Sequence, residues 1–100
     1  MAQVSLSKVS DDNYSIEGCL MMNTVMSIIS EFNDCLKKSH SEVSIDFAGV
    51  ENSDSAAVAL IIAWLAEAKQ NNTELHLVNL PQQIIDIAKA SDLMDILHIA

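Results

Sequence analysis

The 100-residue sequence is poor in basic residues and in glycine. It has five lysines and no arginine against 14 acidic residues, which gives a net charge of -9. Such a negative surface repels the phosphates of nucleic acids and of anionic lipid headgroups, so direct binding to either is disfavoured. The two glycines form no loop of the GxGxxG or GxxxxGK[ST] type. A nucleotide-binding loop is therefore not expected.

Metal-binding and catalytic patterns are also missing. His40, His76 and His98 are far apart in the sequence and form no HxxxH pair, and Cys19 and Cys35 form no CxxC pair. No nucleophile with a neighbouring base is recognisable. The sequence therefore predicts a protein without catalytic residues, cofactor or bound metal. The cysteines are expected to be small buried apolar residues, and a disulfide between them stays open.

The sequence contains no long hydrophobic run. The first 20 residues lack the basic start and apolar stretch of a secretory signal. The longest charge-free helical stretch, residues 55–66, is shorter than the roughly 20 apolar residues that a membrane span requires. We therefore expect a cytoplasmic protein. Half of the residues are hydrophobic, which is enough for one folded domain over residues 1–100.

Strand and helix patterns alternate along the chain. Strands are predicted where apolar and polar residues alternate, in residues 3–9, 13–17, 42–47 and 73–78. Helices are predicted where apolar residues recur at helical spacing, over residues 20–38, from Ser55 to about Asn71, and from Pro81 to about Ser91. Residues 11–13 predict a hairpin turn, and Gly18 is expected to end the second strand. Residues 95–99 fit either a short edge strand or a frayed tail.

The strand pattern also predicts how the layers stack. Apolar side chains of all these strands would share one face of the sheet, while polar residues such as Ser7, Asp46 and His76 would line the other. A parallel sheet covered on both faces would show near-continuous apolar strands. The pattern therefore predicts a two-layer α/β fold, in which helices cover one face of a mixed sheet of roughly four to five strands.

The helix that begins at Ser55 is apolar most of the way round. At about 100° per residue, one stripe is formed by Val58, Ile61, Ile62 and Leu65, and a second by Ala57, Leu60, Trp64 and Ala68. The sheet can bury the first stripe. The second is expected at the edge of the core or outside it, where Trp64 would contact a protein partner. In the alternative, Trp64 packs under a terminal segment of the same chain.

The start of this helix contains a candidate modification site. Ser55 follows Asp54 and lies beside the unpaired backbone N–H groups of the first turn. A phosphate on its hydroxyl would be held by these donors and by the positive end of the helix dipole, and it would repel a partner that binds the unmodified apolar surface. In the alternative, Ser53, Asp54 and Ser55 only cap the helix.

The order of elements, with V-x-x-x-D-S (Val50, Asp54, Ser55) opening the central helix, resembles a STAS domain, the fold of bacterial anti-sigma-factor antagonists and of sulfate-transporter tails. The resemblance covers nearly the whole chain. In the antagonists a partner kinase phosphorylates the serine or threonine after the aspartate, and Ser55 stands at that position. The antagonist pattern D-S-[SAT]-G-L-G is not kept, because Ala57 and Ala59 replace both glycines and Val58 replaces the leucine.

The sequence is more similar to the MlaB-like family, the small STAS subunits of the Mla phospholipid ABC transporter of Gram-negative bacteria. The family order D-[ST]-x-x-LAL-x-x-WL-x-x-A, NLP-x-Q and IA-x-x-S-x-L is matched by Asp54, Ser55, Ala59, Leu60, Trp64, Leu65, Asn79, Leu80, Pro81, Gln83, Ile87, Ala88, Ser91 and Leu93. The resemblance implies a non-catalytic cytoplasmic subunit, peripheral to the inner membrane, that binds the transporter ATPase and supports its assembly and activity.

Two functions follow from these patterns. In the first, a subunit of a transporter for lipid asymmetry binds the ATPase through Asp54, Ser55, Ala56, Ala57, Leu60 and Trp64. In the second, an anti-sigma-factor antagonist binds an anti-sigma factor or serine kinase and is regulated by phosphorylation at Ser55. A small enzyme has the least support, since no catalytic cluster is recognisable.

Overall fold

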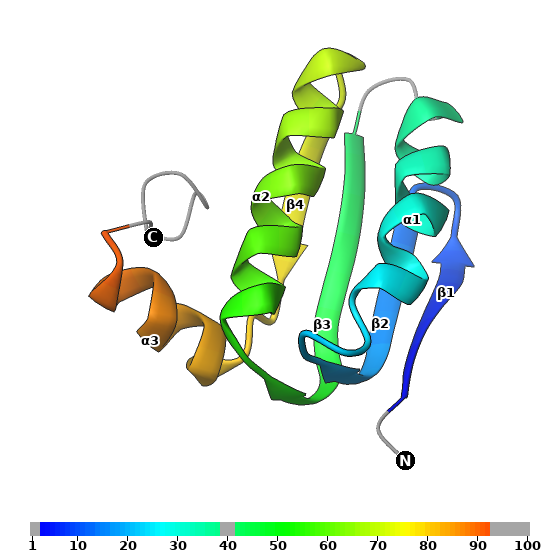
Figure 1. Ribbon diagram of the computed structural model, residues 1–100. Helices are drawn as coiled ribbons and strands as arrows, with labels where there is room; N and C mark the ends of the chain where they lie inside the picture. The colour runs from blue at the N-terminus through cyan, green and yellow to red at the C-terminus, as the bar shows by residue number, and fades with distance from the viewer. Residues whose placement is uncertain (1–2, 39–41, 93–100) are drawn as a thin grey trace.

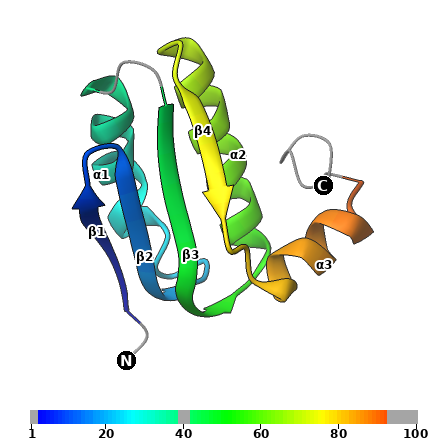
Figure 2. The ribbon, with the colours of Figure 1, turned by 180° about the vertical axis from the view of Figure 1, so that it is seen from behind.

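The computed structural model describes residues 3–38 and 42–92, in which helices lie on one face of a four-stranded sheet (Figures 1 and 2). The elements are β1 (Val4–Ser10), β2 (Asn13–Leu20), α1 (Met26–Lys38), β3 (Glu42–Ser53), α2 (Ser55–Gln70), β4 (Glu74–Val78) and α3 (Gln82–Ala90). Helices α1 and α2 cover the sheet, and α3 packs beside α2. Among these described elements, no helix is long and apolar enough to cross a membrane.

The sheet is mixed, as the sequence pattern predicts. Its strand order is β1-β2-β3-β4, with β1 antiparallel to β2 and with parallel pairing of β2 to β3 and of β3 to β4. The face toward the helices is apolar and includes the buried side chains of Ile16, Val43 and Ile45. The other face carries exposed polar residues such as Ser7 and His76. The two-layer α/β prediction is therefore confirmed.

Two predicted boundaries are wrong near the end of β2. The strand does not end at Gly18 but continues to Leu20, because Gly18 adopts a φ of 103° that lets the strand pass through an irregularity in its pairing with β3. Helix α1 begins at Met26 rather than at Leu20. The intervening residues form turns around buried Thr24, whose hydroxyl donates a 2.6 Å hydrogen bond to the carbonyl of Cys19. Residues 95–99 lie outside the described residues.

The second apolar stripe of α2 is buried within the chain, so the prediction that it lies at the edge of the core is wrong. Ala57 and Trp64 are fully buried, and Leu60 is 2% exposed. The Trp64 ring lies 4.6 Å from that of Phe32, centroid to centroid. Its indole N–H donates a 3.3 Å hydrogen bond to the backbone carbonyl of Ile29. The covering element is α1, which neither sequence interpretation considered.

The position of α2 in the helix layer explains its composition. It packs on β4, against α1 on one side and against α3 on the other (Figure 1). A helix with neighbours on several sides needs apolar residues around most of its circumference. The charge-free stretch of α2 therefore reflects its central place in this domain. A partner is not required to explain it.

Candidate functional site

The site begins at the sharp turn from β3 into α2. Asp54 is the N-cap residue, with extended backbone angles, and one carboxylate oxygen accepts a 2.9 Å hydrogen bond from the backbone N–H of Ala56. This bond satisfies one of the donors that a helix start leaves unpaired. The capping interpretation of Asp54 is therefore correct. Ser55, the first residue of the helix, is exposed to solvent.

The same aspartate also joins α2 to the loop between β2 and α1. Its second carboxylate oxygen accepts a 3.3 Å hydrogen bond from the backbone N–H of Met22, and its own N–H donates to the carbonyl of Leu20 at 3.2 Å. Both carboxylate oxygens thus accept backbone hydrogen bonds. Asp54 holds two surface segments together, and this structural role leaves its oxygens poorly placed to act as a general base.

A third segment is attached through Ser53. Both its backbone N–H and its hydroxyl donate to the side-chain oxygen of Gln83, at 3.0 and 3.2 Å. Gln83 lies in the first turn of α3. The start of α2 is therefore connected to the loop before α1 through Asp54 and to α3 through Ser53, which gives this end of the helix layer a defined shape.

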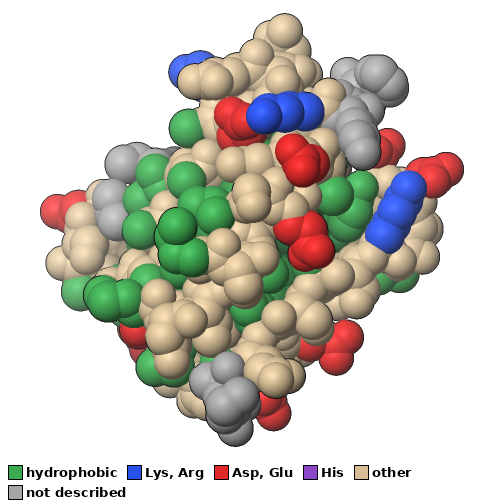
Figure 3. All heavy atoms as spheres, turned by 45° about the vertical axis from the view of Figure 1, so that its right-hand side comes forward, with side chains coloured by type: hydrophobic (Ala, Val, Ile, Leu, Met, Phe, Trp, Pro, Cys, Tyr) green, Lys and Arg blue, Asp and Glu red, His purple; other side chains and the backbone are tan. Residues whose placement is uncertain are grey.

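Exposed apolar side chains lie near the starts of α1 and α2. Met22 and Met26 are 76% and 73% exposed, and the outer side of α2 presents exposed Ser55, Ala59 and Ala63. We call these five residues the helix-start surface. The starts of α1 and α2 point to the same end of the molecule, and hydrophobic side chains gather over the helix layer in Figure 3. Exposed methionines adapt their shape to a partner, and alanines let another chain approach closely, so this surface suits protein binding.

The predicted contact residues divide into two groups. Asp54 and Ala56 are half-buried beside exposed Ser55, so the structure brings these three together at the surface. Ala57, Leu60 and Trp64 point into the core instead. The sequence interpretation missed Met22 and Met26. A methionine before α1 and another at its first residue carried the only signal, and nothing local distinguishes exposed methionines from buried ones.

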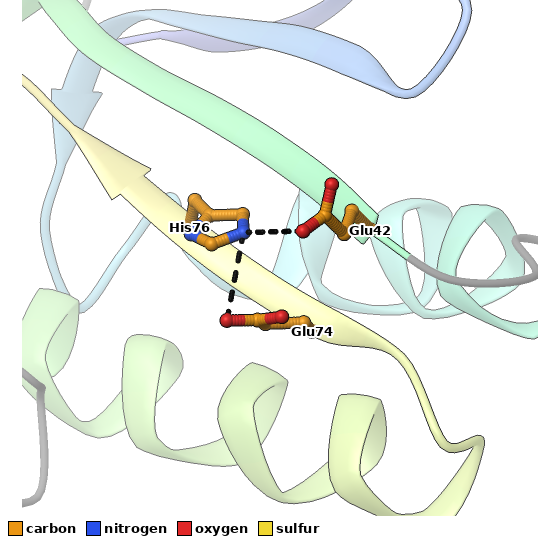
Figure 4. A group of neighbouring side chains, drawn as sticks. All are labelled: Glu42, Glu74 and His76. Atoms are coloured by element: carbon orange, nitrogen blue, oxygen red, sulfur yellow. Dashed lines mark ion pairs between the residues drawn. The ribbon is translucent and has the colours of Figure 1, made fainter.

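A separate cluster of polar side chains lies on the helix-free face of the sheet (Figure 4). The Nε2 atom of His76 is 3.7 Å from a carboxylate oxygen of Glu42 and 3.8 Å from one of Glu74. The sequence predicts no metal site, because its histidines show no HxxxH spacing, yet the structure brings His76 close to two carboxylates. The neighbours come from the adjacent strand and from two residues earlier in β4, which a search for local histidine motifs does not find.

Comparison with known proteins agrees with this architecture. Over residues 7–98 the chain matches the family model described as "Mlab, STAS domain". No curated protein sequence matches the chain.

Among solved structures, the anti-sigma factor antagonist SpoIIAA in its unphosphorylated form is similar, with a TM-score of 0.69 and 18% identity over 90% of this chain and 81% of that one. An anti-sigma-factor antagonist STAS domain from Rhodobacter sphaeroides has a TM-score of 0.56 and 17% identity, over 75% of this chain and 85% of that one. A crystal structure of Mglu is similar over 78% of this chain but only 20% of its own length, with a TM-score of 0.58 and 10% identity.

At these identities the structural likeness establishes the fold, and the family match over nearly the whole chain establishes the family. The mixed sheet with helices on one face and the Asp54-Ser55 turn into α2 are the features expected from the sequence resemblance. The chain belongs to the MlaB-type STAS domain family.

Proposed function

We propose that the chain is a non-catalytic cytoplasmic subunit of a phospholipid-transport ABC complex, and that it binds the ATPase subunit through the helix-start surface. Membership of the MlaB-type family is the observation that carries this proposal. Contact with the ATPase would keep the chain at the periphery of the inner membrane. The chain would in turn stabilise the assembled ATPase.

The position and chemistry of the helix-start surface support a docking role. Asp54 fixes the Met22 loop against the start of α2, so the apolar groups are presented by an ordered backbone before any partner arrives. Preorganisation of this kind lowers the entropic cost of association. The small exposed side chains of Ala59 and Ala63 leave room for a side chain or helix of the partner to approach the α2 backbone. Met22 and Met26 take the place of the buried Ala57, Leu60 and Trp64 in the proposed contact.

Co-purification tests the proposal directly. A tagged copy of the chain, co-expressed with the ATPase subunit of the transporter, is expected to recover that subunit. The Ala59→Lys variant should lose most of the recovery, because a long charged side chain is added at the centre of the contact. Ala59 is exposed, so the variant should stay within about 0.5 kcal/mol of the original stability.

A matched variant distinguishes the loss of a docking contact from the effect that any added positive charge has on binding. Ser7→Lys adds the same charge on the helix-free face of the sheet and should retain full recovery of the ATPase. If the original chain recovers no ATPase, the proposed function is wrong. If both lysine variants bind equally well, the partner binds elsewhere on the domain.

The exposure of Ser55 supports a second candidate, an anti-sigma-factor antagonist regulated by phosphorylation at that residue. The hydroxyl is open to a kinase and lies at a helix start, where a phosphate is stabilised by backbone donors and the helix dipole. Intact-mass measurement after incubation with a cognate serine kinase should then show one added phosphate on the chain and none on Ser55→Ala. An unmodified mass for both proteins contradicts this second function and leaves the first unaffected.

A further inference from the structure

We propose that Glu42, Glu74 and His76 form a binding site for a divalent transition-metal ion such as Zn²⁺ on the helix-free face of the sheet. One atom from each of these side chains lies within 4.8 Å of the others. The group combines an imidazole with two carboxylates, which is a common ligand set for zinc. Figure 4 shows the three side chains directed toward one another from β3 and β4.

The backbone explains why these side chains converge. In the parallel pairing of β3 and β4, Glu42 lies opposite Glu74 and Ser44 lies opposite His76. Side chains two residues apart in a strand share a face, so Glu74 and His76 project on the same side of β4. The register of the two strands fixes the positions of all three residues. None of the proposed ligands therefore lies in a loop.

The two distances from His76 to the carboxylates are close to those of a zinc site. With Zn–N and Zn–O bonds of about 2.0–2.2 Å and tetrahedral geometry, ligand atoms lie roughly 3.3–3.5 Å apart. The Nε2 atom of His76 is 3.7 Å from Glu42 and 3.8 Å from Glu74. Small rotations of exposed side chains can close this difference, and a fourth position would be left for water. Mg²⁺ and Ca²⁺ prefer more oxygen ligands, so a transition metal fits this group better.

The charge of the cluster also favours a cation. Like charges directly opposite each other on neighbouring strands are destabilising, and Glu42 and Glu74 form such a pair. A divalent ion between them would remove this repulsion and join β3 to β4. A protonated His76 could partly do the same, so the experiment must distinguish metal binding from an ion pair.

The site lies away from the proposed docking contact. Glu42 and Glu74 begin their parallel strands, whereas Ser55 follows the far end of β3. The cluster also lies on the sheet face opposite the helices, because its residues are exposed while their strand neighbours Val43 and Leu75 are buried under the helix layer. Metal binding and ATPase binding can therefore be tested separately, and the failure of one does not affect the other.

Calorimetric titration with Zn²⁺ tests the proposal on the full chain. The original protein should bind zinc, and His76→Gln should weaken binding by about tenfold or more, equivalent to at least ~1.4 kcal/mol. The His76 side chain is 44% exposed, so this variant should fold normally. Zinc should raise the melting temperature of the original protein and not that of His76→Gln, because the ion binds only the folded arrangement.

Two controls identify the ligands. Glu17→Gln removes an exposed carboxylate from β2 and should leave zinc affinity unchanged. A His40→Gln, His98→Gln double variant should also retain the affinity, because these histidines are outside the proposed ligand set. Equal zinc binding by His76→Gln and the original protein overturns the proposal, and so does loss of binding in the double variant.

Discussion

Replacing Trp64 by alanine should strongly destabilise the domain. The side chain is fully buried, packs on Phe32 and donates a hydrogen bond to the carbonyl of Ile29. Removing a buried tryptophan typically costs about 3–5 kcal/mol, part of it from the cavity that remains. A domain of this size has roughly 5–15 kcal/mol of total stability, so the variant should be near the limit of folding. The melting temperature should fall by about 15 °C or more.

Urea unfolding followed by far-ultraviolet circular dichroism measures this loss. Fluorescence is unsuitable because Trp64 is the single tryptophan of the chain. Met26→Ala is the matched control, since a side chain that is 73% exposed should contribute no more than about 0.5 kcal/mol. A loss below about 1 kcal/mol for Trp64→Ala would refute the packing of α1 over the second stripe. In that case Trp64 would return to the set of candidate partner contacts.

Other substitutions test the remaining contacts. Burial, a hydrogen bond with Cys35 and nearby acidic charges raise the pKa of Tyr14 from 10.0 to about 12. The unfolded chain ionises this group first, so Tyr14 adds stability below pH 10 that is lost as the pH rises toward 12, and urea midpoints of Tyr14→Phe should lack this decline. Asp54→Ala removes the cap of α2 and the bond to Met22, and its free energy of unfolding should fall by about 1–2 kcal/mol in urea titrations, while Asp54→Asn should lose less. Gly18→Ala should lose more than about 1 kcal/mol and reduce hydrogen-exchange protection along β1, because φ is 103° there and the added methyl group would collide with a neighbouring backbone carbonyl.

The elements that local patterns determine were predictable from the sequence. Alternation in β3 and β4 and the Asp54-Ser55 cap identified the strands, the open face of the sheet and the start of α2. These signals depend on residues a few positions apart. The family resemblance was visible for the same reason, since its motif lies around Asp54.

The burial of Trp64 depended on a neighbour that periodicity does not reveal. Helical spacing places Leu60 and Trp64 on one stripe, but whether that stripe meets solvent or another helix depends on how α1 packs across the sheet. The cluster of Glu42, Glu74 and His76 was hidden for a related reason, because Glu42 meets the other two only through strand register. Both features arise between segments that are distant in the sequence.

The paired bonds of the Asp54 carboxylate have a mechanical consequence. One oxygen holds the first turn of α2 and the other holds the segment that carries Met22, so neither can shift without straining the other. A partner that displaced the segment carrying Met22 would therefore also disturb the cap of the central helix. One acidic side chain thus couples the position of the β2–α1 loop to the integrity of the first turn of α2.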